Sequence, residues 1–153
     1  MSTPVKTETR QKSESIQVVV FQMGKELFAV SISEVWEIVL MHPITPVPGS
    51  PDFVEGVVNL RGQIIPIINL SKRLGIEAKE ITSDTRIVVA QVGENTVGMI
   101  VDAVEKVTHI PTEDIEVPNG IALEGEVLNY VQGIAKVEEG LITLVDLEEA
   151  ISL

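Results

Sequence analysis

Few side chains in this chain of 153 residues could carry out covalent or acid–base chemistry. Cysteine is absent, which excludes thiolate nucleophiles and cysteine-ligated metals, and the two histidines are His42 and His109. His42 directly precedes Pro43 and His109 lies two residues before Pro111, so we predict that both histidines belong to turns or strand ends. The HExxH and GxSxG spacings and the glycine-rich phosphate loop do not occur.

Carboxylates are the remaining candidates for catalysis. Glu34 with Glu37, and Glu138 with Glu139, are close enough in sequence to act as an acid and a base. Neighbouring acids are more often solvated surface groups, and no nucleophile or set of metal ligands accompanies these pairs. We therefore predict that the protein is not an enzyme and that it holds no cofactor and no metal.

Arg61 stands out by its position. It is the only lysine or arginine between Lys25 and Lys72, and it interrupts the aliphatic run GVVNLRGQIIPIINL at residues 56–70. A guanidinium suits an interface because it is planar and weakly hydrated. The same side chain could also extend from a turn into solvent or pair with a local acid. Solvation and recognition of a partner both stay open at this point.

The composition indicates that strands hold these side chains in place. Hydrophobic residues make up 44% of the chain but aromatic residues only 3%, so the core must consist of Val, Ile and Leu, which suit pleated sheets. A net charge of -12 opposes binding to nucleic acid and to anionic membrane surfaces. The chain has no signal peptide and no apolar run long enough to span a bilayer, so we expect a soluble, cytoplasmic protein.

The chain resembles itself over most of its length. Residues 16–39 match residues 85–108 at an offset of 69, and residues 53–70 match residues 130–147 at an offset of 77. Two self-matches in the same order indicate a duplication.

We predict pseudo-duplicated halves at about residues 16–84 and 85–153, after a flexible tail at residues 1–15. Short strands at regular spacing favour a small barrel or sandwich in each half. About 65 residues are marginal for independent stability, so the halves should share a core.

Turn and cap residues mark the expected elements. Gly24 and Gly93 each lie at the turn of a predicted hairpin, and short helices are expected after Asn69 and Asp146, which are suitable N-caps.

The secondary structure of residues 32–38, before Arg61, is ambiguous in the sequence. Ile32, Val35 and Ile38 recur every three residues, which fits one helical turn leading out of a strand or an irregular strand in a groove wall. Trp36 falls outside this apolar set and is either peripheral packing or an exposed anchor.

The two copies differ at one turn. The offset of 77 places Glu138 opposite Arg61 and Glu139 opposite Gly62, whereas the flanking aliphatic positions match. The second copy thus keeps the strands and changes the charge of the turn.

Residues 44–75, ITPVPGSPDFVEGVVNLRGQIIPIINLSKRLG, closely resemble the segment that marks the CheW-like family. The Pro-Val-Pro, Phe-Val-Glu-Gly and Asn-Leu-Arg-Gly elements occur in the order and spacing of that family, and the resemblance extends from about residue 16 to residue 153. It implies an all-β fold with minor helix, in which two tandem SH3-like five-stranded β-barrels pack on a shared hydrophobic core.

The resemblance also implies a function. A free-standing member is a non-catalytic chemotaxis signalling adaptor that couples the cytoplasmic tips of methyl-accepting chemoreceptors to the regulatory domain of the histidine kinase CheA. It would be cytoplasmic, recruited to membrane-associated receptor arrays, without nucleic-acid binding or direct membrane insertion. The residues by themselves leave an alternative, a small-molecule-binding β-barrel module in which Arg61 holds an anionic group.

Carried over residue by residue, the resemblance implies two binding sites. The receptor-binding groove would involve Val19, Ile32, Val35, Glu37, Ile38, Asn59 and Arg61, with Arg61 orienting an apolar receptor helix. The kinase-binding surface would lie on the first barrel at Pro48, Gly49, Ser50, Phe53 and Gly56. One departure from the family is Val39-Leu40-Met41, where charged and polar residues are usual.

Overall fold

The structure, a computed structural model, describes residues 14–77, 79–117 and 130–151. Most of the expected tail at residues 1–15 lies outside the described residues, although Ser15 already begins the first strand. Residues 119–129, NGIALEGEVLN, lie between the two matched segments of the second copy, where the offset changes from 69 to 77, and they are also outside the described residues.

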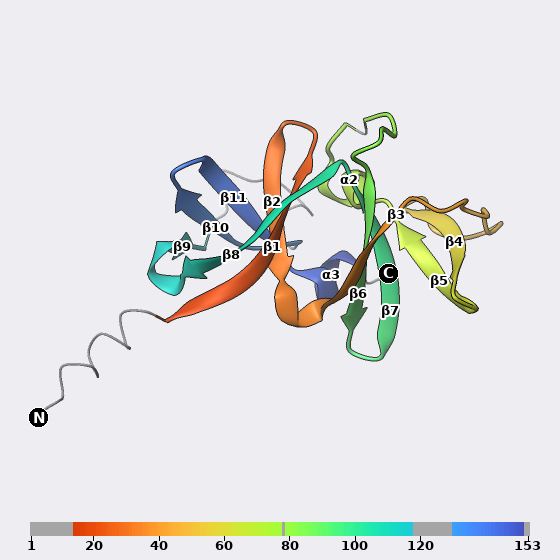
Figure 1. Cartoon of the computed structure of the whole chain (residues 1–153), viewed down its shortest axis with the longest axis horizontal. Coiled ribbons are helices and arrows are strands. Elements are labelled where there is room, and N and C mark those ends of the chain that lie inside the picture. Colours follow the sequence, from red (N-terminus) through yellow and green to blue (C-terminus); the bar gives the residue numbers. More distant parts are fainter. Residues whose placement is uncertain (1–13, 78, 118–129, 152–153) are drawn as a thin grey trace, which may run out of the picture.

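Short β-strands make up most of the described chain, together with two short α-helices and two 3-10 turns (Figure 1). The elements up to residue 74 are β1 (Ser15–Met23), β2 (Glu26–Ser31), η1 (Ile32–Glu34), β3 (Val35–Leu40), β4 (Val54–Leu60), β5 (Gln63–Ile68) and α2 (Leu70–Leu74). The later elements are β6 (Arg86–Val92), β7 (Asn95–Val101), β8 (Ala103–Pro111), η2 (Thr112–Asp114), β9 (Ile115–Glu116), β10 (Val131–Val137), β11 (Gly140–Val145) and α3 (Leu147–Ala150).

The strands form two curled sheets that lie next to each other (Figure 1). The first, sheet A, has the order β8-β1-β2-β11-β10-β9, and the second, sheet B, has the order β3-β6-β7-β5-β4. Each sheet therefore draws strands from both halves of the sequence, whereas we expected one barrel or sandwich in each half. The hairpins β1–β2 and β6–β7 are exchanged between the halves.

Residues related by the two sequence offsets occupy equivalent places in the two sheets. Val19 pairs with Val107 in sheet A, and its counterpart Val88 pairs with Ile38, the counterpart of Val107, in sheet B. The parallel contacts match as well, because Leu144 pairs with Ala29 in sheet A and the corresponding Ile67 pairs with Gly98 in sheet B. A hairpin with this pattern can therefore pair with either copy of its partner strands.

The centre of strand β1, residues 18–21, is apolar at four consecutive positions because both faces of the strand are buried there. Val19 and Phe21 lie in the largest core cluster, which also holds Val88 from β6 and so joins the two sheets. Val18 and Val20 point to the other face and pack inside sheet A. The exchanged hairpin thus contributes to two cores at once, and the shared core that we expected is present between the sheets.

The caps expected from sequence form as predicted. The side chain of Asn69 accepts a hydrogen bond from the backbone of Lys72 (3.3 Å) at the start of α2, and the side chain of Asp146 accepts one from Glu149 (3.2 Å) at the start of α3. The spacing of three that was ambiguous in sequence becomes the 3-10 turn η1 followed by strand β3.

Candidate functional site

Arg61 lies at the tip of the β4–β5 hairpin, which projects from sheet B (Figure 1). Leu60 pairs with Gln63, so the turn consists of Arg61 and Gly62, with φ of 52° and 86°. Positive φ at both positions defines a type I′ turn, in which asparagine followed by glycine is the preferred pair. Among the described residues other than glycine, only Arg61 has positive φ. The sequence thus tolerates a strained conformation at this position.

Local contacts hold the hairpin tip in this shape. The Asn59 side-chain oxygen accepts a hydrogen bond from the backbone N–H of Gly62 (2.8 Å). The guanidinium of Arg61 forms an ion pair with Glu37, which lies on β3 at the opposite edge of sheet B. The Arg61 side chain nevertheless remains 68% exposed, so one face of the guanidinium is open to a partner.

The same two edges of sheet B are also joined through the backbone. Thr45 and Val57 exchange two hydrogen bonds of 2.9 Å, so the segment after β3 pairs with β4. Gly56, at the start of this contact, has φ of 149°, and a Cβ there would lie 2.2 Å from the carbonyl oxygen of Thr45. This close approach requires glycine and keeps the hairpin next to β3.

Exposed apolar side chains lie on β3 and β5, the strands that carry Glu37 and follow Arg61. Strand β3 alternates, with Trp36, Ile38 and Leu40 exposed and the residues between them half-buried. Ile64 is also exposed, three residues beyond Arg61 on β5. Trp36, Leu40 and Ile64 are between 60% and 63% exposed, and none of them was in the predicted site. The sequence of β3, VWEIVL, is apolar at every position except Glu37, so it carries no period-two signal that could have identified Trp36 and Leu40.

The other residues predicted to contact the receptor lie deeper. Val19 is buried in the core between the sheets, and Ile32 and Val35 are half-buried against the same core. Ile38 is exposed beside Glu37, and Asn59 is exposed at the hairpin tip. The structure therefore brings Glu37, Asn59 and Arg61 together at the hairpin tip. Ile38 projects from the face of β3 opposite to Glu37, and Val19, Ile32 and Val35 lie in or against the core.

The residues predicted to bind the kinase divide in a similar way. Pro48 and Gly49 are exposed, and Ser50 closes a turn by donating from its hydroxyl to the carbonyl of Val47 (2.8 Å). Phe53 and Gly56 are buried. The first three residues can reach a partner directly, whereas the last two position the segment.

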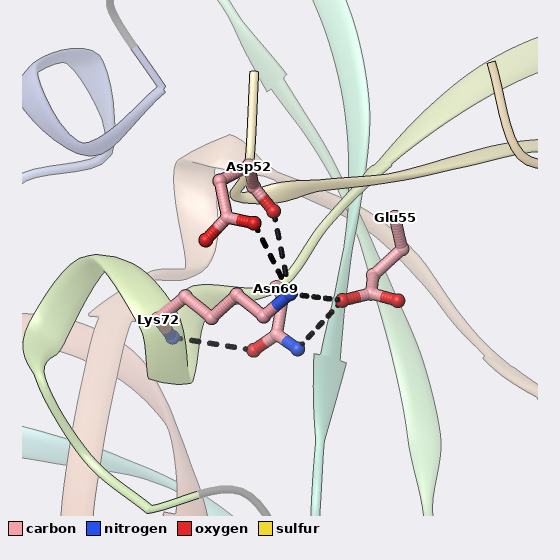
Figure 2. A network of polar contacts seen from close by, with 4 residues as sticks. All are labelled: Asp52, Glu55, Asn69 and Lys72. Carbon is pink, nitrogen blue, oxygen red and sulfur yellow. Dashed lines mark hydrogen bonds and ion pairs between the residues drawn. The ribbon is translucent and has the colours of Figure 1, made fainter. Parts of the chain in front are cut away.

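A polar network holds residues 52–55 against the start of helix α2 (Figure 2). The amine of Lys72 lies 3.4 Å from a carboxylate oxygen of Glu55 and 3.8 Å from one of Asp52. The Asn69 amide donates to the same Glu55 carboxylate (2.9 Å), and its backbone N–H donates to the carbonyl of Phe53 (2.7 Å). These contacts hold the start of β4, the end of β5 and helix α2 together.

An apolar pocket of about 700 Å³ opens beside Phe53. Residues from four stretches of the chain line it, among them Phe53, Ile68, Val97 and Ile151. Pro51, the last residue before the short turn that leads into β4, also lines this pocket.

Sheet A carries a pair of reversed polarity at the equivalent hairpin, in which the acid is Glu139, the counterpart of Gly62, and not Glu138, the counterpart of Arg61. Lys106 on β8 corresponds to Glu37, and it forms an ion pair with Glu139 in the β10–β11 turn. The hydrogen bond from Lys106 lowers the pKa of the Glu139 carboxyl. Val107 and Leu141, the counterparts of Ile38 and Ile64, are exposed beside this pair.

Two titratable groups elsewhere, Glu34 and His42, interact with neighbouring groups of the fold. Burial raises the pKa of Glu34, and the carboxylates of Asp146 and Glu148 raise it further. His42 makes a hydrogen bond of 2.8 Å with the carbonyl oxygen of Leu40. Within the described ranges, no group of three or more His, Asp or Glu side chains could hold a metal ion, and no helix there is long and apolar enough to cross a membrane.

Comparison with known proteins gives a consistent result. The model of the CheW-like domain matches residues 17–153. The chemotaxis protein CheW of Rhizobium meliloti is 39% identical over 132 residues, which cover 86% of this chain and 84% of that protein. The chemotaxis protein CheW of Treponema pallidum is 32% identical over 143 residues, which cover 91% of this chain and 84% of that protein.

A solved structure is similar as well. The crystal structure of the scaffolding protein TtCheW from Thermoanaerobacter tengcongensis superposes with a TM-score of 0.83 at 36% sequence identity, and the match covers 92% of this chain and 90% of that one.

Proposed function

This chain belongs to the CheW-like family and is a chemotaxis coupling adaptor, and we propose that it binds a chemoreceptor tip at the β4–β5 hairpin and the kinase CheA nearby. In this proposal the receptors are methyl-accepting chemoreceptors, and the kinase is bound through its regulatory domain. The adaptor is non-catalytic and works in the cytoplasm, where the receptors recruit it to membrane-associated arrays. Each curled sheet is an SH3-like barrel, which agrees with the joined edges of sheet B.

The conformation of Arg61 is the observation that carries the proposed receptor site. A left-handed conformation is costly for an L-residue, and such strained positions cluster where a side chain must be presented to a partner. The exposed guanidinium beside Glu37 offers charge-assisted hydrogen bonds to an acid or a carbonyl of the receptor. The turn therefore fixes the direction of one strong donor.

The neighbouring strand supplies the apolar part of the site. Trp36, Ile38 and Leu40 project from one face of β3 at every second residue. Over four residues a strand rises about 13 Å, which is the length of about two and a half turns of an α-helix. An amphipathic receptor helix can thus lay one apolar stripe along β3, as in helix-in-groove recognition. Leu40 lies where the family usually has charged or polar residues, so the receptor helix should be apolar there.

We place the kinase-facing surface at Pro48, Gly49 and Ser50. These residues reach the surface, and the network around Lys72 and Glu55 holds the segment in a defined position. A partner that binds here therefore meets a preorganised loop.

A charge reversal tests the receptor site. Arg61→Glu places two carboxylates side by side and removes the donor, so the affinity for a receptor signalling fragment should fall at least about tenfold. The pair is largely exposed, so the melting temperature should change by no more than about 4 °C. Glu139→Lys is the matched control, because it breaks the equivalent exposed pair on sheet A.

The readout is titration of each variant with the fragment, together with a thermal melt. If Arg61→Glu binds like the parent, or if Glu139→Lys weakens binding to the same extent, the hairpin is not the receptor site. The comparisons give no support to the alternative of a small-molecule-binding module.

A further inference from the structure

We propose that Arg73 is a positioning residue that fixes the orientation of the two curled sheets relative to each other. Its side chain extends from helix α2 to contact groups on both sides of the junction between the sheets. A second part of the inference rests on the function proposed above: Arg73 thereby sets the geometry between the receptor-facing and kinase-facing surfaces.

Arg73 lies against two buried aromatic rings. The carbon at the centre of its guanidinium is 3.9 Å from the ring centroid of Phe53 and 4.9 Å from that of Tyr130. Both distances are within the roughly 6 Å that cation–π attraction requires. Phe53 precedes β4 of sheet B, and Tyr130 precedes β10 of sheet A. One guanidinium therefore contacts the residues that lead directly into a strand of each sheet.

A hydrogen bond adds a third, directional contact. The Nε–H of Arg73 donates to the carbonyl oxygen of Ala150 (2.8 Å), the last residue of α3. Arg73 thus joins the two short helices as well as the two rings. A cation near a helix C-terminus is also favoured by the partial negative charge of the last carbonyls.

The partners of Arg73 are equivalent positions in the two copies of the sequence. Phe53 and Tyr130 are related by the offset of 77. Their carbonyls accept equivalent hydrogen bonds, from the backbone of Asn69 (2.7 Å) and of Asp146 (2.8 Å). Arg73 itself corresponds to Ala150, so the second copy has no cation at this place. A single side chain therefore spans two equivalent corners of the fold.

The chemistry of the Arg73 contacts explains why they can fix the angle between the two sheets. The hydrophobic core between the sheets is held by non-directional attraction, which tolerates small rotations. A planar guanidinium that contacts two rings and donates along its edge has a preferred direction for each contact. If the sheets rotate, at least one of the three contacts is lost. Lysine, a compact point charge, cannot reproduce this arrangement.

The position of the contact links it to the proposed surfaces. Phe53 lies three residues after Ser50, at the end of the segment that we assign to the kinase. It also lies directly before β4, which leads to the hairpin tip at Arg61. A change in the Arg73 contacts therefore moves the base of both surfaces relative to sheet A.

The first arm of the test needs no partner. The chain has no cysteine, so Ile64→Cys with Leu141→Cys allows two spin labels at exposed, equivalent positions on the two sheets. The distance distribution between the labels is measured by pulsed electron paramagnetic resonance in the parent, Arg73→Met, Arg73→Lys and Arg86→Met. Arg86 is the matched control, because its guanidinium donates to the local carbonyls of Ser83 and Thr85.

We expect a broadened and shifted distribution for both Arg73 variants and the parent distribution for Arg86→Met. A distribution in folded Arg73→Met that superposes on that of the parent overturns the inference. If Arg73→Met does not fold, Arg73→Lys decides the question, since it keeps the charge and loses the planar contacts. Circular dichroism of each labelled variant establishes that it is folded.

The second arm tests the functional part. The affinity for a receptor signalling fragment is measured with and without a saturating CheA regulatory domain, and the ratio of the two is the coupling factor. We expect both Arg73 variants to bring this factor closer to one, while each separate affinity stays within about threefold. A purely structural role would lower the folded fraction and leave the ratio unchanged.

The two parts of the inference can be refuted separately. A coupling factor of one in the parent, or an unchanged factor in the variants, overturns the link to function while the label distances still decide the positioning role. If the parent binds neither fragment, the proposed function fails and the first arm stands by itself.

Discussion

Replacing Arg61 by asparagine should stabilise the protein or leave its stability unchanged, while weakening its binding to the receptor. Arg61 has φ of 52° in a type I′ turn that is followed by Gly62. Asparagine followed by glycine is the pair that such a turn prefers, because the short amide side chain tolerates the left-handed region. The substitution therefore removes a local conflict and at the same time removes the cation.

The expected magnitudes follow from two opposing terms. The left-handed conformation costs about 1–2 kcal/mol for an ordinary L-residue, and asparagine recovers part of it. The lost ion pair with Glu37 is largely exposed and contributes about 0.2–1 kcal/mol. The net change in the free energy of unfolding is then between zero and about +1 kcal/mol. This corresponds to a rise in melting temperature of up to about 4 °C.

Binding should change in the opposite direction. A hydrogen bond to a charged group contributes about 1.5–3 kcal/mol, so its loss weakens receptor binding by about tenfold or more. Urea denaturation gives the stability, and calorimetric titration with a receptor signalling fragment gives the affinity.

Two results would refute this reasoning. A loss of stability greater than about 1 kcal/mol would mean that the left-handed turn costs arginine little. An unchanged affinity would mean that the guanidinium of Arg61 does not contact the receptor. Glu139→Gln, which removes the corresponding pair with Lys106 on sheet A, should leave receptor binding unchanged.

Two further predictions concern stability. Gly56→Ala should lower the free energy of unfolding by about 2–4 kcal/mol, because the new Cβ would collide with the carbonyl of Thr45. The Cβ of Gly62→Ala would meet no neighbour within 4 Å, so this variant should lose only about 1 kcal/mol. Urea denaturation of both variants checks this, and equal costs would contradict it. The pKa of Glu34 is raised, so the folded state binds a proton on this carboxyl more tightly than the unfolded state does. The group therefore contributes stability below its ordinary pKa of 4.5, and this contribution is lost as the pH rises through the raised value. Glu34→Gln should therefore be more stable than the parent at pH 7, by about 0.5 kcal/mol for a half-buried group, and equal to it near pH 3.5. Denaturation at both pH values tests the sign, and a difference that does not depend on pH would contradict it.

The candidate site could be found from the sequence only in part. Arg61 was identifiable because it interrupts an apolar run and because its counterpart is Glu138. Its ion pair with Glu37 depends on the curling of sheet B, which brings opposite edges of the sheet together. The family resemblance implied that Val19 lines the groove, but Val19 is buried, because β1 is covered on both faces there.

The sequence by itself determined the local elements of this protein. Turns at Gly24 and Gly93, caps at Asn69 and Asp146, and the strands between them follow from preferences that act over a few residues. The two offsets also predicted which residues are equivalent, and the pairing in both sheets follows them.

Only the tertiary structure decided which copies pair with which. The hairpins β1–β2 and β6–β7 carry the same apolar pattern, so either could add to either sheet, and the structure places each one with strands of the other half. The contact of Arg73 with Phe53 and Tyr130 is likewise invisible in the sequence, because it joins residues that are brought together only when both sheets have formed. Periodicity specifies which face of a strand is buried, whereas the choice among equivalent partners depends on packing between residues far apart in the chain.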